Sequence, residues 1–256
     1  LGFLLGGGPG IMSLSEPFLA HSIFGPGRLR RHLARLARKQ NLKFAAPPQS
    51  SAPAPFLEYL ESLAALNAMK TLVIKETFRQ GREWENVKLL DWIVAGANPV
   101  IGITRHPYDA AVSTLRFCRW WRGVVGRVAR LWVPGLPLFA DDEILMKYFA
   151  ANWCGFVRWS REEHLAITRY EDLVRGPQQV LQEVCDRARV AFHPAMVDSS
   201  APRVAFGGIG APEVINRKPR AVHARSVGRK KELPPHLLDI VQSGCADAAR
   251  ELGYDL

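Results

Sequence analysis

The sequence predicts an α/β fold in which a central parallel sheet is flanked by helices in three layers. Short apolar, β-branched segments alternate with longer amphipathic segments along the chain, and this alternation is typical of parallel sheets covered by helices. Of the 256 residues, 48% are hydrophobic, which is enough for a sizeable core. No internal repeat is visible, and the strands are spread over the whole chain, so we expect one domain, residues 1–256.

Each predicted element has a local cause. The strands are short apolar runs with β-branched residues, whereas the helices show apolar residues every three or four positions. The segment from Leu1 to Leu5 reads as the end of a helix stopped by glycine, and Gly253 stops the last helix. The predicted strands are Ile11–Leu14, Thr71–Lys75, Val100–Thr104 and Leu165–Tyr170. The predicted helices are Arg28–Lys39, Phe56–Met69, Trp84–Ala95, one opening at Pro107, Asp141–Glu162, Pro177–Val190 and Pro234–Leu252. The predicted loops, Ala45–Pro55 and Ala191–Ala224, are rich in proline, glycine or serine.

Charge and cysteine usage narrow the function classes. The net charge of +10 favours an anionic partner, although a solvated basic exterior explains it as well. The four cysteines form no CxxC pair, which indicates reduced thiols and a cytoplasmic location. The seven histidines show no metal-ligand spacing, so no metal is expected. No apolar run of about 18 residues occurs, so no membrane span is expected.

The strand Val100–Thr104 leads into a predicted anion site. Arg105 follows the strand directly, at the edge of a parallel sheet where ligands bind. Pro107 then opens a helix, whose first amides attract an anion, and Asp109 lies in its first turn. Ser113, eight residues after Arg105, offers a second donor. The alternative is that Arg105 forms an ion pair with Asp109 and binds no ligand.

The segment from Val100 to Ser113 (VIGITRHPYDAAVS) resembles the 3′-phosphate-binding segment of sulfotransferases that use 3′-phosphoadenosine 5′-phosphosulfate (PAPS). In that family an apolar strand precedes R-[DN]-P-x-D and a serine eight residues after the arginine. Here His106 stands in the second position. The segment Ser15-Glu-Pro-Phe18 also resembles the acidic turn of bacterial members. The resemblance implies a P-loop NTPase-like sulfotransferase fold, with Arg105 and Ser113 holding the 3′-phosphate of PAPS.

Two later segments extend the resemblance. Thr168-Arg-Tyr-Glu-Asp-Leu173 is similar to the family's Y-E-D-L segment, which implies that Tyr170 meets the adenine; a tyrosine packed in the core is the alternative. We expect Glu171 and Asp172 to cap the helix that follows them. The run from Arg225 to Lys230 resembles the loop that closes over the nucleotide, and we call it the closing loop. Its expected nucleotide-binding residues are Arg225, Ser226, Gly228, Arg229 and Lys230.

Two glutamates are candidates for the base that deprotonates the acceptor. Glu16 follows the first predicted strand, where several family members have a glutamate, and it is our first choice. Glu76 follows the strand Thr71–Lys75 and is the second. The family's 5′-phosphosulfate loop precedes its first helix, and the sequence begins inside that helix. We therefore expect a fragment without this loop, and little or no activity from it alone.

The predicted function is transfer of a sulfuryl group from PAPS to a hydroxyl or amine of a small molecule or carbohydrate. The enzymatic alternative is a P-loop nucleotide or small-molecule kinase. The non-enzymatic alternative is a basic module that binds acidic glycan or nucleic acid, although we do not expect nucleic acid as a partner. The segment from Phe117 to Phe139 mixes tryptophan with arginine and is expected to cover the acceptor or to touch a membrane surface. The sequence does not define the oligomeric state.

Overall fold

The chain is described from a computed structural model, which covers residues 2–15, 34–35, 37–38, 40–46, 48, 53–75, 91, 93–96, 98–129, 140–198, 204–206 and 226–256. It divides into two compact units, each built from two separate stretches of sequence. Unit 1 comprises Leu1–Thr77 and Pro177–Val222, and unit 2 comprises Phe78–Gly176 and His223–Leu256. The prediction of one domain for residues 1–256 stays a prediction.

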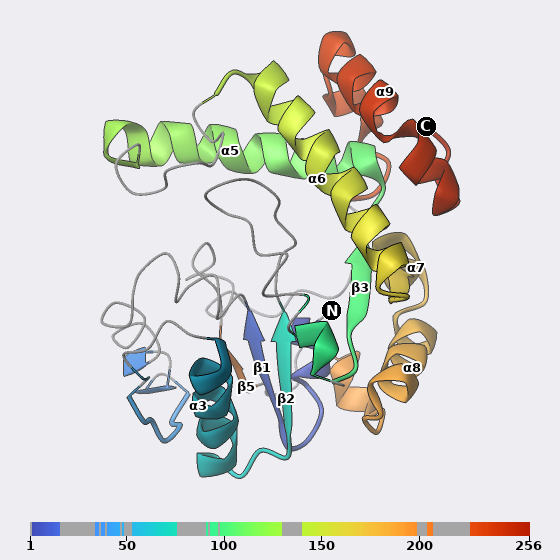
Figure 1. The fold of residues 1–256 in the computed structure, drawn as a ribbon. Helices are drawn as coiled ribbons and strands as arrows, with labels where there is room; N and C mark the ends of the chain where they lie inside the picture. Colours follow the sequence, from blue (N-terminus) through green and yellow to red (C-terminus); the bar gives the residue numbers. More distant parts are fainter. Residues whose placement is uncertain are drawn as a thin grey trace. The chain divides into compact units, whose positions relative to one another are not determined.

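Unit 1 contains a parallel sheet of three strands in the order β2-β1-β5 (Figure 1). In the centre, Met12 and Leu14 are 0% and 1% exposed, because strand β1 has a strand on each side and packs against a helix. The strands are β1 (Ile11–Ser15), β2 (Thr71–Lys75) and β5 (Val204–Phe206). The helices are α1 (Gly2–Leu5), α3 (Pro53–Leu66), α8 (Pro177–Ala188) and the short η2 (Pro194–Met196).

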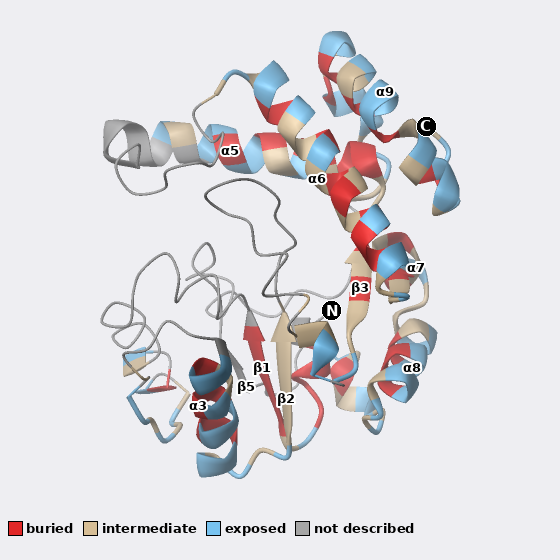
Figure 2. Cartoon of the chain, viewed as in Figure 1, coloured by how far each residue is buried: buried red, intermediate tan, exposed pale blue. Residues whose placement is uncertain are grey.

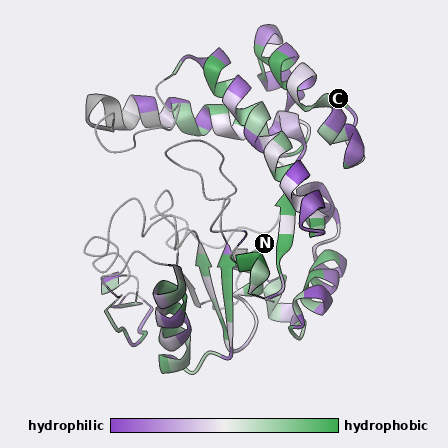
Figure 3. Ribbon diagram, viewed as in Figure 1, coloured by the Kyte–Doolittle hydropathy of each residue, from purple (hydrophilic) through white to green (hydrophobic). Residues whose placement is uncertain are grey.

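Unit 2 contains a parallel pair of strands and the longest helices of the described chain. Its core is apolar and lies between helices α5, α6 and α9, whose buried faces stand out in Figure 2 and whose apolar residues are green in Figure 3. The strands are β3 (Ile101–Thr104) and β4 (Ala166–Arg169). The helices are α5 (Pro107–Ala129), α6 (Asp142–Glu162), α7 (Tyr170–Arg175), η4 (Lys230–Glu232) and α9 (Pro235–Glu251).

The helix ends of unit 2 follow the sequence signals. The Asp141 side chain caps helix α6 by accepting a hydrogen bond from the Ile144 amide, and acidic residues fill the first turn of this helix. Helix α9 opens with Pro235, whose missing N–H is not needed there, and the chain turns away at Gly253 with a φ of 70°. These ends lie within one or two residues of the predicted ones.

The mixed α/β class with parallel strands is confirmed, and two details of the prediction are wrong. Tyr170 does not end a strand: β4 stops at Arg169, and Tyr170 opens helix α7. The strand β5 lies inside the stretch 191–224 that was predicted to be irregular, because three residues are too few to show a pattern. The single three-layer sheet stays a prediction, since the described strands form two sheets. None of the helices in the described ranges is long and apolar enough to cross a membrane.

Candidate functional site

The carboxyl ends of the two strands of unit 2 bring Arg105 and Tyr170 together. Strands β3 and β4 are parallel with Thr104 opposite Arg169, so the residue after each strand leaves the same edge of the sheet. The Arg105 guanidinium carbon lies 4.9 Å from the centre of the Tyr170 ring, a cation–π distance. Two residues that the sequence analysis selected from segments far apart are therefore neighbours.

Ser226 of the closing loop joins this pair through two hydrogen bonds. The Arg105 guanidinium donates to the Ser226 carbonyl oxygen. The hydroxyl groups of Ser226 and Tyr170 share a hydrogen bond of 2.9 Å between their oxygens. Three chain segments thus meet at a single guanidinium.

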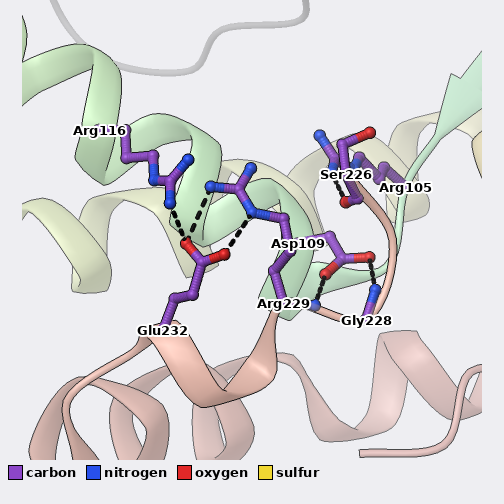
Figure 4. Close-up of polar contacts among 7 residues, drawn as sticks. All are labelled: Arg105, Asp109, Arg116, Ser226, Gly228, Arg229 and Glu232. Carbon is purple, nitrogen blue, oxygen red and sulfur yellow. Dashed lines mark hydrogen bonds and ion pairs between the residues drawn. The ribbon is translucent and has the colours of Figure 1, made fainter. Parts of the chain in front are cut away.

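Asp109 fixes the next part of the closing loop (Figure 4). Its carboxylate is buried, with 2% exposure, and accepts hydrogen bonds from the amides of Gly228 at 2.9 Å and Arg229 at 2.6 Å. Gly228 has a φ of 79°, a left-handed conformation that turns two consecutive amides toward one carboxylate. The carboxylate therefore holds the loop, and the suggested ion pair between Arg105 and Asp109 is not the arrangement seen.

The two cations at the end of the closing loop have partners of their own. The Arg229 guanidinium meets Glu232 at 3.0 Å, and Glu232 also meets Arg116 at 2.5 Å (Figure 4). The hydrogen bond from Arg229 lowers the pKa of Glu232, and the same bond raises the pKa of Arg229. The Lys230 ammonium lies 4.6 Å from the centre of the Tyr108 ring. Arg229 is therefore held in an ion pair, whereas Lys230 lies against an aromatic ring.

Arg105 differs from Arg229 in its lack of a carboxylate partner. Among the described residues no carboxylate lies within ion-pair distance of it, and its Nε–H is buried without a hydrogen-bond partner. A buried, unpaired donor on a charged group is costly unless a ligand or solvent satisfies it. An anionic ligand is one partner that would satisfy this donor.

The backbone beside Arg105 is held by three residues that the sequence analysis did not select for this role. The Trp153 indole donates to the Arg105 carbonyl oxygen at 3.1 Å. The Glu171 carboxylate is 3% exposed and accepts from the His106 amide at 2.9 Å and from the Tyr254 hydroxyl at 3.0 Å. Because both oxygens of the Glu171 carboxylate bind these other segments, the prediction that it caps the helix that follows it is wrong. No sequence signal links these residues, since their partners are 48 to 83 positions away.

The C-terminal residues cover this junction. Burial raises the pKa of the Tyr254 hydroxyl, as does the neighbouring Glu171, so the hydroxyl stays protonated and can donate to the carboxylate. The Arg169 guanidinium lies 4.3 Å from the centre of the Tyr254 ring, and the His106 ring bonds the Asp255 carbonyl at 2.9 Å. The His106 amide donates to Glu171, so it is not available to an anion.

Ser113 lies on the face of helix α5 that carries Asp109 and Arg116. The spacings of four and three residues place these side chains above one another, on the side that meets the closing loop. Ser113 is exposed. The structure therefore places it one turn beyond the loop anchor, and its predicted contact with phosphate stays a prediction.

The remaining predicted site residues, Glu16, Glu76 and Arg225, lie outside the described residues. The residues before the two glutamates, Ser15 and Lys75, are register partners in the sheet of unit 1. Within the described ranges, no group of three His, Cys, Asp or Glu side chains is placed to hold a metal ion.

Comparison with solved structures identifies the fold. The sulfotransferase domain from the Synechococcus PCC 7002 olefin synthase is 21% identical, with a TM-score of 0.57, over 100% of this chain and 90% of that one. The sulfotransferase domain from the curacin biosynthetic pathway is 18% identical, with a TM-score of 0.49, over 96% of this chain and 98% of that one. No family model and no curated protein matches the chain. The first similarity shows that this chain has the fold of a sulfotransferase domain, and at that level it confirms the resemblance predicted from the sequence.

Proposed function

We propose that this protein is a sulfotransferase that moves a sulfuryl group from PAPS to a hydroxyl or amine of a small molecule or carbohydrate. The fold supports the reaction class. The observation that carries the nucleotide assignment is Arg105, a guanidinium at a strand end with a buried, unsatisfied N–H and no carboxylate partner in the described part of the chain. A guanidinium fork is suited to bind a phosphate through two parallel hydrogen bonds.

The residues around Arg105 fit an adenosine 3′-phosphate. The Nε–H of Arg105 lacks a protein acceptor, and Ser113 presents a hydroxyl from helix α5. The Tyr170 ring offers one face to Arg105 and an aromatic surface for adenine. Ser226, Gly228, Arg229 and Lys230 shape the closing loop beside it, with Arg225 preceding them in the sequence.

The protein's part in the transfer is to bind, to orient and to accept a proton. The donor supplies an activated sulfuryl group, which the acceptor oxygen or nitrogen attacks in line. Arg105 and Lys230 are the described cations that can stabilise negative charge on the nucleotide product. Glu16, or in its place Glu76, takes the acceptor proton. Each follows the end of a strand in unit 1, and the two strands are neighbours.

The acceptor surface is proposed to include helix α5. Phe117 and Trp120 expose 43% and 55% of their surfaces there, which is unusual for large apolar side chains. They match the predicted aromatic and cationic segment 117–139, described as far as Ala129. Apolar acceptors, carbohydrates and membrane surfaces all suit such a segment. A cytoplasmic location is part of this proposal.

Calorimetry with 3′,5′-ADP tests the nucleotide assignment. We expect binding by the unmodified protein and a loss of about 10- to 100-fold in Arg105→Ala, since a hydrogen bond to a charged group contributes about 1.5–3 kcal/mol. The control is Arg250→Ala, which removes the same charge from an exposed pair on helix α9. We expect 5′-ADP, which lacks the 3′-phosphate, to bind more weakly. Equal binding of the two nucleotides, or equal affinity in Arg105→Ala, contradicts the proposal and favours a kinase or a general anion-binding module.

A further inference from the structure

Two cysteines from different helices lie together in unit 2, away from Arg105 in the sequence and unused by the proposed reaction. Cys154 is on helix α6 and Cys245 is on helix α9, and the two helices pack against each other. The Cys154 thiol donates to the Gly244 carbonyl oxygen at 3.1 Å, so its sulfur lies against the backbone that leads into Cys245. The two thiols lie close enough for each to shift the pKa of the other.

The two helices approach closely at this point. A Cβ atom placed on Gly244 would lie 2.8 Å from the Ala150 Cβ, closer than real Cβ atoms come, so only glycine permits the contact. Ala150 precedes Cys154 by one helical turn and lies on the same face. The two helix backbones are therefore in close contact one residue before Cys245 and one helical turn before Cys154.

The two thiols differ in access. Cys154 is partly exposed, whereas Cys245 is 0% exposed. The hydrogen bond from Cys245 lowers the pKa of Cys154 to about 7 against the opposing effect of burial; Arg158 lowers it further and Asp247 raises it. The pKa of Cys245 is raised by the same hydrogen bond and by burial. Cys154 is thus a reachable sulfur with thiolate character near neutral pH, and Cys245 is a protonated thiol directly behind it.

The other two cysteines lack this combination. Cys118 is 2% exposed and Cys185 is 0% exposed, and burial raises the pKa of Cys185. Cys185 contacts the Met196 sulfur, which cannot complete a disulfide bond. Only the pair on α6 and α9 joins an accessible sulfur to a second thiol, among the cysteines, all of which lie in the described part of the chain.

We propose that Cys154 and Cys245 are an oxidisable thiol pair, which a hydroperoxide converts to a reversible disulfide bond. The Cys154 thiolate attacks the outer peroxide oxygen, the O–O bond breaks, and the leaving oxygen departs with a proton as water or an alcohol. This leaves Cys154 as a sulfenic acid. The Cys245 sulfur then attacks the Cys154 sulfur, and the S–O bond breaks with release of water. The two thiols together lose two protons and two electrons, and the peroxide gains them.

Peptide mass spectrometry on the whole native chain tests this proposal without an activity assay. After brief exposure to hydrogen peroxide and blocking of free thiols, we expect one linked peptide pair containing Cys154 and Cys245. Its mass is about 2 Da below the sum of the two peptides, and dithiothreitol removes the link. In Cys245→Ala we expect the sulfenic acid on Cys154 to persist and to react with dimedone. Cys118→Ser and Cys185→Ser are the matched controls and should leave the bridge unchanged.

Three outcomes overturn the proposal. One is a native chain in which Cys154 stays a free thiol while the half-buried Met69 is oxidised. Another is a bridge that joins either cysteine to Cys118, to Cys185 or to a second chain. The third is dimedone labelling of Cys154 at the same level in the unmodified protein as in Cys245→Ala. The first two are read on the unmodified protein, so they do not depend on the folding of a variant. The result is also independent of nucleotide binding and of the proposed reaction.

Discussion

The carboxylate of Asp109 is expected to decide whether the closing loop stays in place. It is 2% exposed and binds the amides of Gly228 and Arg229 at 2.9 and 2.6 Å. In Asp109→Asn the size of the side chain is kept, but one oxygen becomes an NH₂ group. Only one loop amide then finds an acceptor, and the other faces a donor. The substitution therefore tests the charge and the second acceptor rather than the packing.

The size of the effect follows from these two bonds. A hydrogen bond to a charged group contributes about 1.5–3 kcal/mol, and a buried donor left unsatisfied costs about 1–3 kcal/mol. Because these two effects overlap, we expect the docked loop to lose about 2–4 kcal/mol. At about 1.4 kcal/mol for each factor of ten, the open form becomes about 30 to 700 times more populated.

Amide hydrogen exchange measures this opening directly. We expect exchange in a peptide covering residues 226–232 to accelerate by about that factor, because local opening limits exchange of protected amides. Asp239→Asn is the matched control, since Asp239 is exposed on helix α9 and the charge change is the same. The reasoning fails if protection of this peptide in Asp109→Asn equals that in Asp239→Asn. It also fails if protection drops equally throughout the chain, which would indicate global destabilisation.

Three further predictions concern stability and are read by urea unfolding. Gly228→Ala should lower the free energy of unfolding by about 1–2 kcal/mol because of the φ of 79°, and not through a clash, since nothing lies within 4 Å of the added Cβ. Gly123→Ala, in helix α5, should instead raise the free energy of unfolding by up to about 1 kcal/mol. Tyr254→Phe should lower the free energy of unfolding by about 1.5–3 kcal/mol, because it removes a hydrogen-bond donor from buried Glu171. Tyr148→Phe should be neutral or stabilising, because the buried Tyr148 hydroxyl has no partner among the described residues. Equal losses in the two variants would contradict the assignment. Burial raises the pKa of Asp142, but hydrogen bonds from Arg119 and Arg122 outweigh this effect, so the pKa in the folded state is lowered. The carboxylate therefore stabilises the fold above its unfolded-state pKa, and this stabilisation is lost as the pH falls through its folded-state pKa. Asp142→Asn should flatten the loss of stability between about pH 5 and 2, and an unchanged slope would refute this.

The sequence predicts those parts of the fold and site that depend on neighbouring residues. The strand Thr71–Lys75 was predicted with its observed bounds, and helix α5 opens at the predicted proline. The run from Thr104 through Arg105 to Pro107 also lies as expected, because strand, turn and helix start are encoded within a few residues. The same signals fail at Tyr170, a good strand former that opens a helix because a regular ladder with β3 ends one residue earlier.

The sequence pattern does not predict contacts between segments that are far apart in the chain. The partners of Asp109 are 119 and 120 positions away, and the two partners of Glu171 are 65 and 83 positions away. The spacing in the R-x-P-x-D segment does not show that its aspartate binds backbone amides rather than the arginine. Family resemblance placed the closing loop near Arg105, but only the structure shows that a buried carboxylate holds it.

The distribution of charge in the closing loop changes how its basic residues are interpreted. A run of cations suggests that each one meets a phosphate, yet Arg229 and Arg116 share Glu232. An ion pair of this kind orders the loop and leaves little charge for a ligand. Arg105 combines a buried, unsatisfied Nε–H with the lack of a carboxylate among the described residues. A guanidinium without a carboxylate partner is suited to a ligand anion, so the affinity for phosphate is expected to depend on Arg105, while Arg229 serves the geometry of the loop.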